Sequence, residues 1–161
     1  MKKYKLFLIV LNLVLLLVYF NHSLVKKEEL LKHGKLMLLA LAPVDPRSLM
    51  QGDYMVLRYQ LALDADKEHL AKRGYCVVKL VNGIAQSIRF QKDRTPLKKG
   101  EYLIEYTSPN LWSINIGAES FFFEEGQAKK YEQAKYGGVK VDENGNSLLV
   151  GLYDEKLKKI E

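Results

Sequence analysis

The sequence has few of the residues that build disulfides and metal centres. Among its 161 residues there is one cysteine, Cys76, and there are three histidines, at positions 22, 33 and 69. A single cysteine excludes an intramolecular disulfide, and the apolar surroundings of Cys76 suit a small buried side chain. The cysteine and histidines show no zinc-ligand spacing. We therefore expect no metal and no other cofactor.

The part of the chain that follows the N-terminal region lacks an excess of charge of one sign. The net charge of +6 is concentrated in residues 1–35, which hold seven lysines and two glutamates, whereas residues 36–161 hold 18 basic and 17 acidic residues. Binding to nucleic acid needs a concentrated basic face that neutralises phosphates. We therefore expect no nucleic-acid partner.

Only one apolar run is long enough to matter for a membrane. It extends from Leu6 to Phe20 with one interruption, at Asn12, and reaches twenty residues if it is counted to Val25. About 20 residues cross the hydrocarbon core of a bilayer. No small-x-small cleavage site follows, which argues against a signal peptide. We predict an uncleaved membrane anchor, with the lipid bilayer as its partner through residues 6–25.

The charges that flank this run give a weak signal for orientation. Three lysines precede the run and two follow it, so the positive-inside bias is small, but the tail before the run is only five residues long. We predict a single-pass inner-membrane protein with its N-terminus in the cytoplasm and the rest extracytoplasmic, or periplasmic. Residues 24–33 continue at helical spacing, and Gly34 is expected to end the helix.

The remainder of the chain is typical of a β-rich domain. Asn82-Gly83 between two β-prone runs is a strong hairpin signal. Strands are expected at 36–41, 57–63, 75–81, 84–90, 102–106, 112–116, 139–141 and 147–153, with short helices at 64–74 and 127–136 and a turn at 142–146. We predict an α+β fold that is mainly antiparallel β, a sandwich or small barrel. The domains are then the anchor, 1–34, and the β-rich domain, 35–161.

The most distinctive stretch is Gly52-Asp53-Tyr54-x-x-Leu57-x-Tyr59. Leu57, Tyr59, Leu61 and Leu63 alternate with other residues, as on a half-buried strand. The stretch resembles, residue for residue, the signature of the GDYXXLXY domain family, whose members are bacterial, membrane-anchored and without an established biochemical role. The resemblance covers about residues 35–153.

A second stretch, Glu119 to Gly126, is also similar to that family. It contains three consecutive phenylalanines followed by acidic residues and a glycine, and Glu124 stands where the family has a proline. From the two stretches we select candidate binding or motif residues: Asp45, Pro46, Arg47, Gly52, Asp53, Tyr54, Leu57, Tyr59, Glu119, Glu125 and Gly126. No catalytic residue is assigned.

Three candidate residues have more than one interpretation. Arg47 and Asp53 flank the loop before the signature, where they either face a ligand together or close the loop on each other. Tyr54 either lines a groove or packs beside a neighbouring strand. The sequence leaves both choices open.

Two classes of function fit this organisation. The first is a membrane-anchored binding or assembly module, an accessory subunit of an envelope complex or of a polytopic membrane protein, a partner that the family resemblance also implies. The second is a signal-peptidase-like hydrolase with Ser48 as nucleophile and Lys79 as base. The Ser-Met-x-Pro surroundings of those enzymes are missing from this sequence. We expect the binding module and no enzyme activity.

Overall fold

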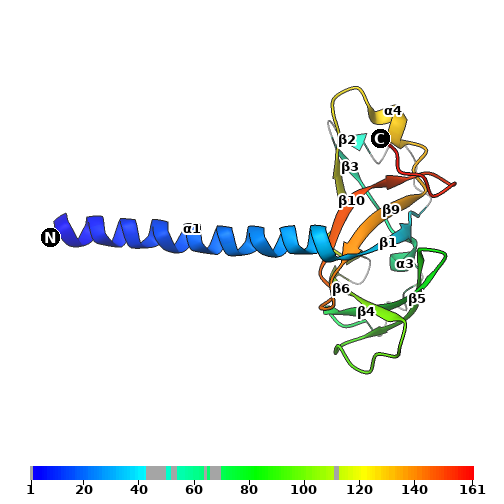
Figure 1. Ribbon diagram of the computed structural model, residues 1–161, viewed down its shortest axis with the longest axis horizontal. Coiled ribbons are helices and arrows are strands. Elements are labelled where there is room, and N and C mark those ends of the chain that lie inside the picture. The colour runs from blue at the N-terminus through cyan, green and yellow to red at the C-terminus, as the bar shows by residue number, and fades with distance from the viewer. Residues whose placement is uncertain (1, 43–49, 52–53, 64, 66–69, 111–112) are drawn as a thin grey trace.

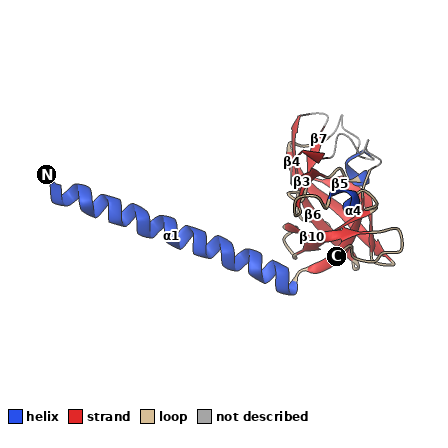
Figure 2. Ribbon diagram, turned by 90° about the horizontal axis from the view of Figure 1, so that it is seen from above, coloured by secondary structure: helices blue, strands red, loops and turns tan. Residues whose placement is uncertain are grey.

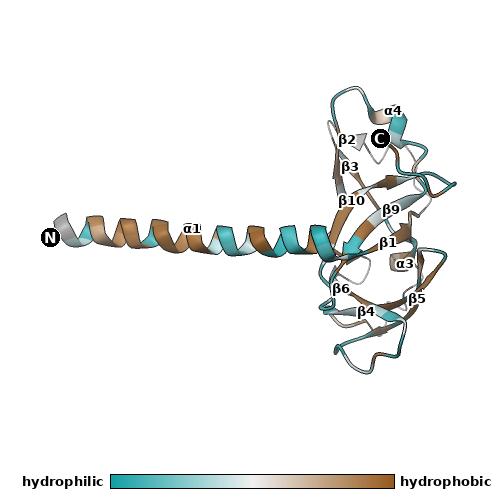
Figure 3. Ribbon diagram, in the orientation of Figure 1, coloured by the Kyte–Doolittle hydropathy of each residue, from teal (hydrophilic) through white to brown (hydrophobic). Residues whose placement is uncertain are grey.

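The computed structural model consists of one long N-terminal helix that projects from a β-rich domain (Figure 1). It describes residues 2–42, 50–51, 54–63, 65, 70–110 and 113–161. The helix, α1, spans Lys2–His33. Among the described residues it is the one helix long and apolar enough to cross a membrane. Figure 3 shows that its apolar part lies toward the N-terminus and its polar turns lie next to the domain.

Helix α1 passes into the domain through a single residue. It ends at His33, as the sequence predicts, and Gly34 donates its backbone N–H to the carbonyl of Leu30 over 2.9 Å. Strand β1 (Lys35–Ala40) begins immediately afterwards. A side chain at position 34 would collide with Leu30, so glycine is required by this close approach.

Seven strands form the main sheet, in the order β10-β9-β1-β5-β4-β6-β7. All neighbours are antiparallel except β1 and β5. The sheet curls into a half-barrel (Figure 2). The strands after β1 are β4 (Arg73–Val81), β5 (Ile84–Gln91), β6 (Glu101–Asn110), β7 (Ser113–Asn115), β9 (Tyr136–Val141) and β10 (Ser147–Tyr153).

A smaller sheet of three strands lies beside the main one, in the order β2-β3-β8. Its strands are β2 (Met50–Gln51), β3 (Tyr54–Val56) and β8 (Ser120–Phe122), and all are antiparallel. Two helices of one turn each, α3 (Gln60–Leu63) and α4 (Ala128–Tyr131), connect the elements.

One hydrophobic core joins the two sheets. It contains Met37 and Leu39 from β1, Cys76 and Val78 from β4, and Ile104 from β6, all almost fully buried. These side chains alternate along their strands, so each strand of the main sheet presents one face to the core. Met55 of β3 and the signature residues Leu57 and Tyr59 close the core from the side of the smaller sheet.

The predicted fold class is confirmed, and so are the hairpins. Asn82 and Gly83 both have positive φ, 53° and 83°, as a tight hairpin turn between β4 and β5 requires. The turn at 142–146 connects β9 and β10, as expected.

Three predicted elements are corrected. No strand covers 57–63: β3 ends at Val56, Tyr59 makes an isolated bridge with Leu41, and Gln60–Leu63 is helical. Of the predicted helix at 64–74, residues 64 and 66–69 lie outside the described part, 70–72 are not helical, and Gly74 belongs to β4. The helix at 127–136 shrinks to α4, since a turn follows at residues 132–133 and Tyr136 already belongs to β9.

Candidate functional site

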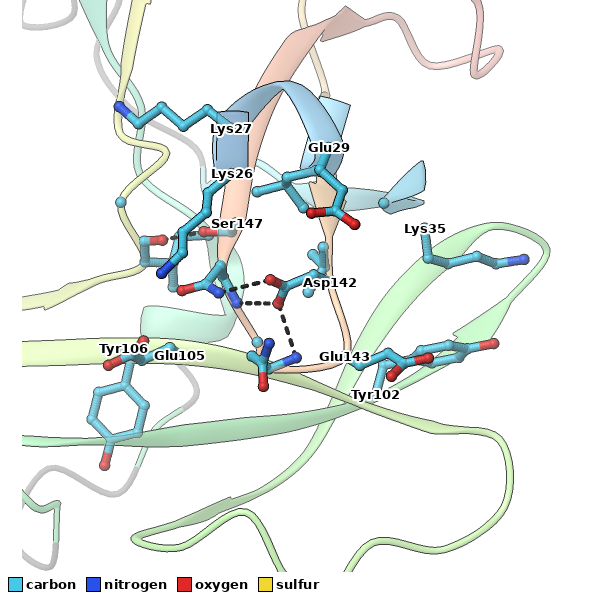
Figure 4. Close-up of a pocket in the computed structure, with 18 of the residues that line it drawn as sticks. Lys26, Lys27, Glu29, Lys35, Tyr102, Glu105, Tyr106, Asp142, Glu143 and Ser147 are labelled. Atoms are coloured by element: carbon cyan, nitrogen blue, oxygen red, sulfur yellow. Dashed lines mark hydrogen bonds between the residues drawn. The ribbon is translucent and has the colours of Figure 1, made fainter. Parts of the chain in front are cut away.

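A cleft of about 1130 Å³ lies where α1 meets the domain. One wall is formed by about three turns of α1, from Ser23 to His33. The opposite wall is formed by β6 and by the turn at 142–146 between β9 and β10 (Figure 4). The cleft therefore begins at the last turn of the predicted membrane segment, residues 6–25, and extends beyond it.

The turn that forms this wall is held by its own hydrogen bonds. The carboxylate of Asp142 accepts the backbone N–H groups of Asn144 and Asn146 at 2.9 and 2.8 Å, and the side-chain amide of Asn146 at 2.7 Å (Figure 4). Gly145, with φ of 91°, accepts the backbone N–H of Glu105 over 2.8 Å. The turn is thus fixed to β6, and this wall is formed before any partner binds.

The cleft carries charges of both signs in equal number. Its basic side chains are Lys26, Lys27, Lys35 and Arg73, and its acidic side chains are Glu29, Glu105, Asp142 and Glu143. Arg73 and Glu105 approach each other to 3.8 Å. A cleft that selected phosphates or other anions would need an excess of positive charge. The mixed charge suits a polar protein surface, which presents both signs.

The hydroxyl group of Ser147, in the cleft, has a structural role. Ser147 donates its hydroxyl proton to the carbonyl of Ile116, and this bond ties the start of β10 to the segment after β7. A serine nucleophile needs a base at hydrogen-bond distance, and a backbone carbonyl is not one. Within the described ranges, no group of three or more His, Cys, Asp and Glu side chains is placed to hold a metal ion.

The signature residue Tyr59 holds the core together. Its side chain is 3% exposed, and its hydroxyl donates to the carbonyl of Ala118 over 2.5 Å. Its ring lies against Gly137 of β9, where an added Cβ would come within 2.9 Å of the ring. Burial, and secondarily the charge of Glu119, raises the pKa of Tyr59 well above its ordinary value. Tyr59 is thus a neutral hydrogen-bond donor inside the core.

The two candidate stretches of the sequence are neighbours in the fold. Strand β3 pairs with β8 so that Tyr54 lies opposite Phe122 and Met55 opposite Phe121. The backbone N–H of Leu57 donates to the carbonyl of Glu119 over 2.7 Å, and the Glu119 carboxylate accepts the N–H of Ile116. Tyr54 therefore packs beside a neighbouring strand, one of the two alternatives for this residue. Glu119 holds the connection between β7 and β8.

The model of the GDYXXLXY protein family matches residues 16–152, most of the sequence. The chain belongs to the GDYXXLXY family. The match starts inside α1, so it includes the passage from helix to β1 as well as both sequence stretches. Neither a curated protein nor a solved structure matches the chain.

The described part of the GDYXXLXY signature is Tyr54, Leu57 and Tyr59. Five candidate residues, Asp45, Pro46, Arg47, Gly52 and Asp53, lie outside the described residues, and so does Ser48. The interpretations of the Arg47–Asp53 pair and of a Ser48–Lys79 pair therefore stay predictions. Lys79 itself is an exposed residue of β4.

The remaining candidates, Glu125 and Gly126, lie in an exposed turn after β8. Gly126 has φ of 82°, a conformation that favours glycine. Glu124 accepts the side-chain amide of Gln127 over 2.8 Å. The corner thus forms a turn with glutamate at position 124.

Sequence reasoning missed the residues of the cleft. The lysines after the predicted span and the Asp142 turn were both visible in the sequence, but they lie more than 100 positions apart. Only the curl of the sheet brings β10 to the end of α1. No local pattern in the sequence encodes that approach.

Proposed function

We propose that this GDYXXLXY chain is a membrane-anchored, extracytoplasmic binding and assembly module, an accessory subunit of an envelope complex or of a polytopic membrane protein. No catalysis is part of this proposal. The apolar helix supplies the anchor, and the cleft beyond it supplies a pre-formed surface of mixed charge. A partner that lies in the same membrane reaches this cleft most directly.

The observation that carries the proposal is the rigid passage from α1 to the domain. Leu30 of the last helical turn is buried, Gly34 is bonded back to it, and β1 starts one residue later. Lys140 of β9 donates its ammonium group to the carbonyl of Leu31, which satisfies one carbonyl of the helix end. A domain fixed in this way presents one constant face to its membrane neighbours.

The orientation across the membrane is tested by fusions. Because three lysines precede the span and two follow it, an alkaline-phosphatase fusion after Lys35 is expected to be active. A cytoplasmic reporter at the same point is expected to be silent. The reverse pattern would overturn the extracytoplasmic location.

The partner is tested by photo-crosslinking from the cleft. A photo-reactive amino acid replaces Glu143, an exposed cleft residue, in the full chain, and the crosslinked products from detergent-solubilised membranes are identified by mass spectrometry. We expect an integral membrane protein as the main product. The matched control replaces Lys156, which is exposed in the turn after β10.

Comparing positions 143 and 156 distinguishes a specific partner of the cleft from proteins that collide with the domain at random. Strand β10 starts at the cleft and runs away from it, so the turn with Lys156 lies at the other end of the strand. Figure 1 shows this turn, in red, on the side of the domain away from α1. Equal crosslinking from both positions, or products that are all soluble proteins, would contradict the proposal.

The hydrolase alternative makes the opposite prediction for Ser48. If the chain is a binding module, Ser48→Ala complements a deletion of the gene as well as the parent does. If Ser48 is a nucleophile, the variant is folded, membrane-bound and inactive, and the parent chain reacts with a fluorophosphonate probe.

A further inference from the structure

The outer face of the smaller sheet carries an unusual apolar surface. Phe122 of β8 is 73% exposed, the most exposed large hydrophobic side chain in the described part of the domain. Val56 of β3 is 41% exposed and lies on the same face. The ring of Tyr54 packs beside Phe122 with 5.7 Å between the ring centres. We call Tyr54, Val56 and Phe122 the aromatic face.

The inner face of the same sheet is already occupied. Met55 is buried in the core, and Phe121 packs edge-to-face on Tyr131 of α4 with 4.9 Å between the ring centres. The outer face therefore carries large aromatic and aliphatic side chains beside the small polar Ser120, whereas an antiparallel sheet that has one face in water usually presents polar residues there. An exposed patch of this kind marks an interaction surface.

The aromatic face is turned toward the membrane side of the domain. Figures 1 and 2 both show β3 on the flank of the domain nearest the N-terminus. Because the inner face of the sheet packs on the core, its outer face points away from the domain on this flank. The rigid passage at Gly34 fixes this orientation relative to α1.

The height of this flank above the hydrocarbon is only a few ångströms more than the thickness of the headgroup layer. From Val25, the end of the predicted span, to His33 the helix rises only about 12 Å. The polar layer of a bilayer extends about 5–8 Å beyond the hydrocarbon on each side. A flank that faces back along α1 therefore comes close to the headgroups. Aromatic and aliphatic side chains are favourable at this boundary.

We propose that the aromatic face rests on the lipid surface of the same bilayer that α1 crosses, with Phe122 as its main apolar contact. This inference rests on the proposed membrane anchoring. The domain would then have two attachments to the membrane, one through α1 and one through the smaller sheet. A lipid surface is the occupant that the geometry favours, because α1 places the membrane itself opposite this face.

The test uses the full chain inserted in vesicles of phosphatidylethanolamine and phosphatidylglycerol. In a Cys76→Ala background, Ser120→Cys carries an environment-sensitive fluorophore, since Ser120 is exposed on the same face as Phe122. Spin-labelled lipid in the vesicles quenches a fluorophore that touches the bilayer. A fluorophore at Lys156→Cys, on the distant turn, is the control.

We expect quenching at position 120 to exceed quenching at position 156 several-fold. Adding Phe122→Ser to the Ser120→Cys chain is expected to remove most of this difference, whereas Phe122→Leu keeps it. A matched change at another exposed apolar residue, Ile88→Ser, is expected to leave it unchanged. Circular dichroism verifies that each variant is folded.

The outcomes separate this inference from the function on which it rests. A chain that fails to float with the vesicles overturns both. A chain that inserts but shows equal quenching at the two positions overturns the lipid contact alone. If position 120 shows no quenching by lipid but crosslinks to a protein in native membranes, the aromatic face is a protein-docking surface and the inference is wrong.

Discussion

At the residue scale, Leu57 and Tyr59 of the signature are parts of the core. Leu57 is 3% exposed, and its backbone is bonded to Glu119. Tyr59 combines a buried ring with a hydroxyl that satisfies the carbonyl of Ala118. A phenol fits this place because it fills apolar volume and still offers one donor to a buried acceptor.

Shortening Leu57 is therefore expected to destabilise the domain. Leu57→Ala should lower the free energy of unfolding by about 2–5 kcal/mol, because a buried large side chain leaves a cavity. Chemical denaturation of the domain measures the difference. The control is Val81→Ala at a 42% exposed position, where a change within about 0.5 kcal/mol is expected. Equal melting of both variants would mean that the signature is not a folding element.

A second residue-scale prediction concerns pH. Arg89 forms two bonds of 2.9 Å with the carboxylate of Glu101, and with the backbone N–H of Lys98 it lowers the pKa of Glu101 from 4.5 to about 2. A carboxylate whose pKa is lowered by folding stabilises the fold at pH values above its unfolded-state pKa. This stabilisation is lost as the pH falls from about 4.5 to 2. In Glu101→Gln the melting temperature should therefore depend less on pH between about 4.5 and 2.

Thermal melts between pH 6 and pH 2 measure this effect. The control is Glu155→Gln, at an exposed position in the turn after β10. An unchanged pH profile in Glu101→Gln would show that the Arg89 pair does not contribute to acid sensitivity.

At the element scale, hairpins were predictable and non-local pairings were not. Asn82-Gly83 carries its own conformational signal, so the β4–β5 hairpin could be located from two residues. The period of two around Leu57 correctly predicted that Leu57, Tyr59 and Leu61 are buried, but Leu63, which it placed on the same face, is 52% exposed. It did not reveal that the chain leaves the sheet after Val56, because a buried loop and a short helix can bury the same residues. The cleft and the β3–β8 pair depend on contacts between distant segments.

The β4–β5 turn yields a test at this scale. Gly83 has positive φ, and its carbonyl accepts the N–H of Leu38 from the parallel strand β1 over 3.0 Å. Gly83→Ala should lower the free energy of unfolding by about 1–2 kcal/mol, the penalty for an L-amino acid in the left-handed conformation. Gly83→Asn should lower the free energy of unfolding by less, since Asn adopts this conformation more readily than Ala. No side chain crowds the position, so the cost arises from the backbone alone.

At the scale of the whole molecule, the passage at Gly34 decides what the domain can reach. Insertion of a flexible Gly-Ser linker between Gly34 and Lys35 should leave the melting temperature of the domain nearly unchanged, because most core contacts lie within the sheets. It should strongly reduce crosslinking from position 143 and lipid quenching at position 120. Crosslinking and quenching at parental levels would show that the fixed orientation is unnecessary.

The direct continuation of α1 into β1 also has a mechanical consequence. On the proposed membrane anchoring, a helix of 32 residues joined stiffly to a sheet would act as a lever whose fulcrum lies in the bilayer. In a thinner membrane a long apolar helix tilts, and each degree of tilt turns the attached domain by the same amount. The edge of the sheet that carries β3 would press toward the lipid or lift from it as the helix leans. The angle at which the cleft faces a neighbouring membrane protein would then depend on the thickness of the membrane.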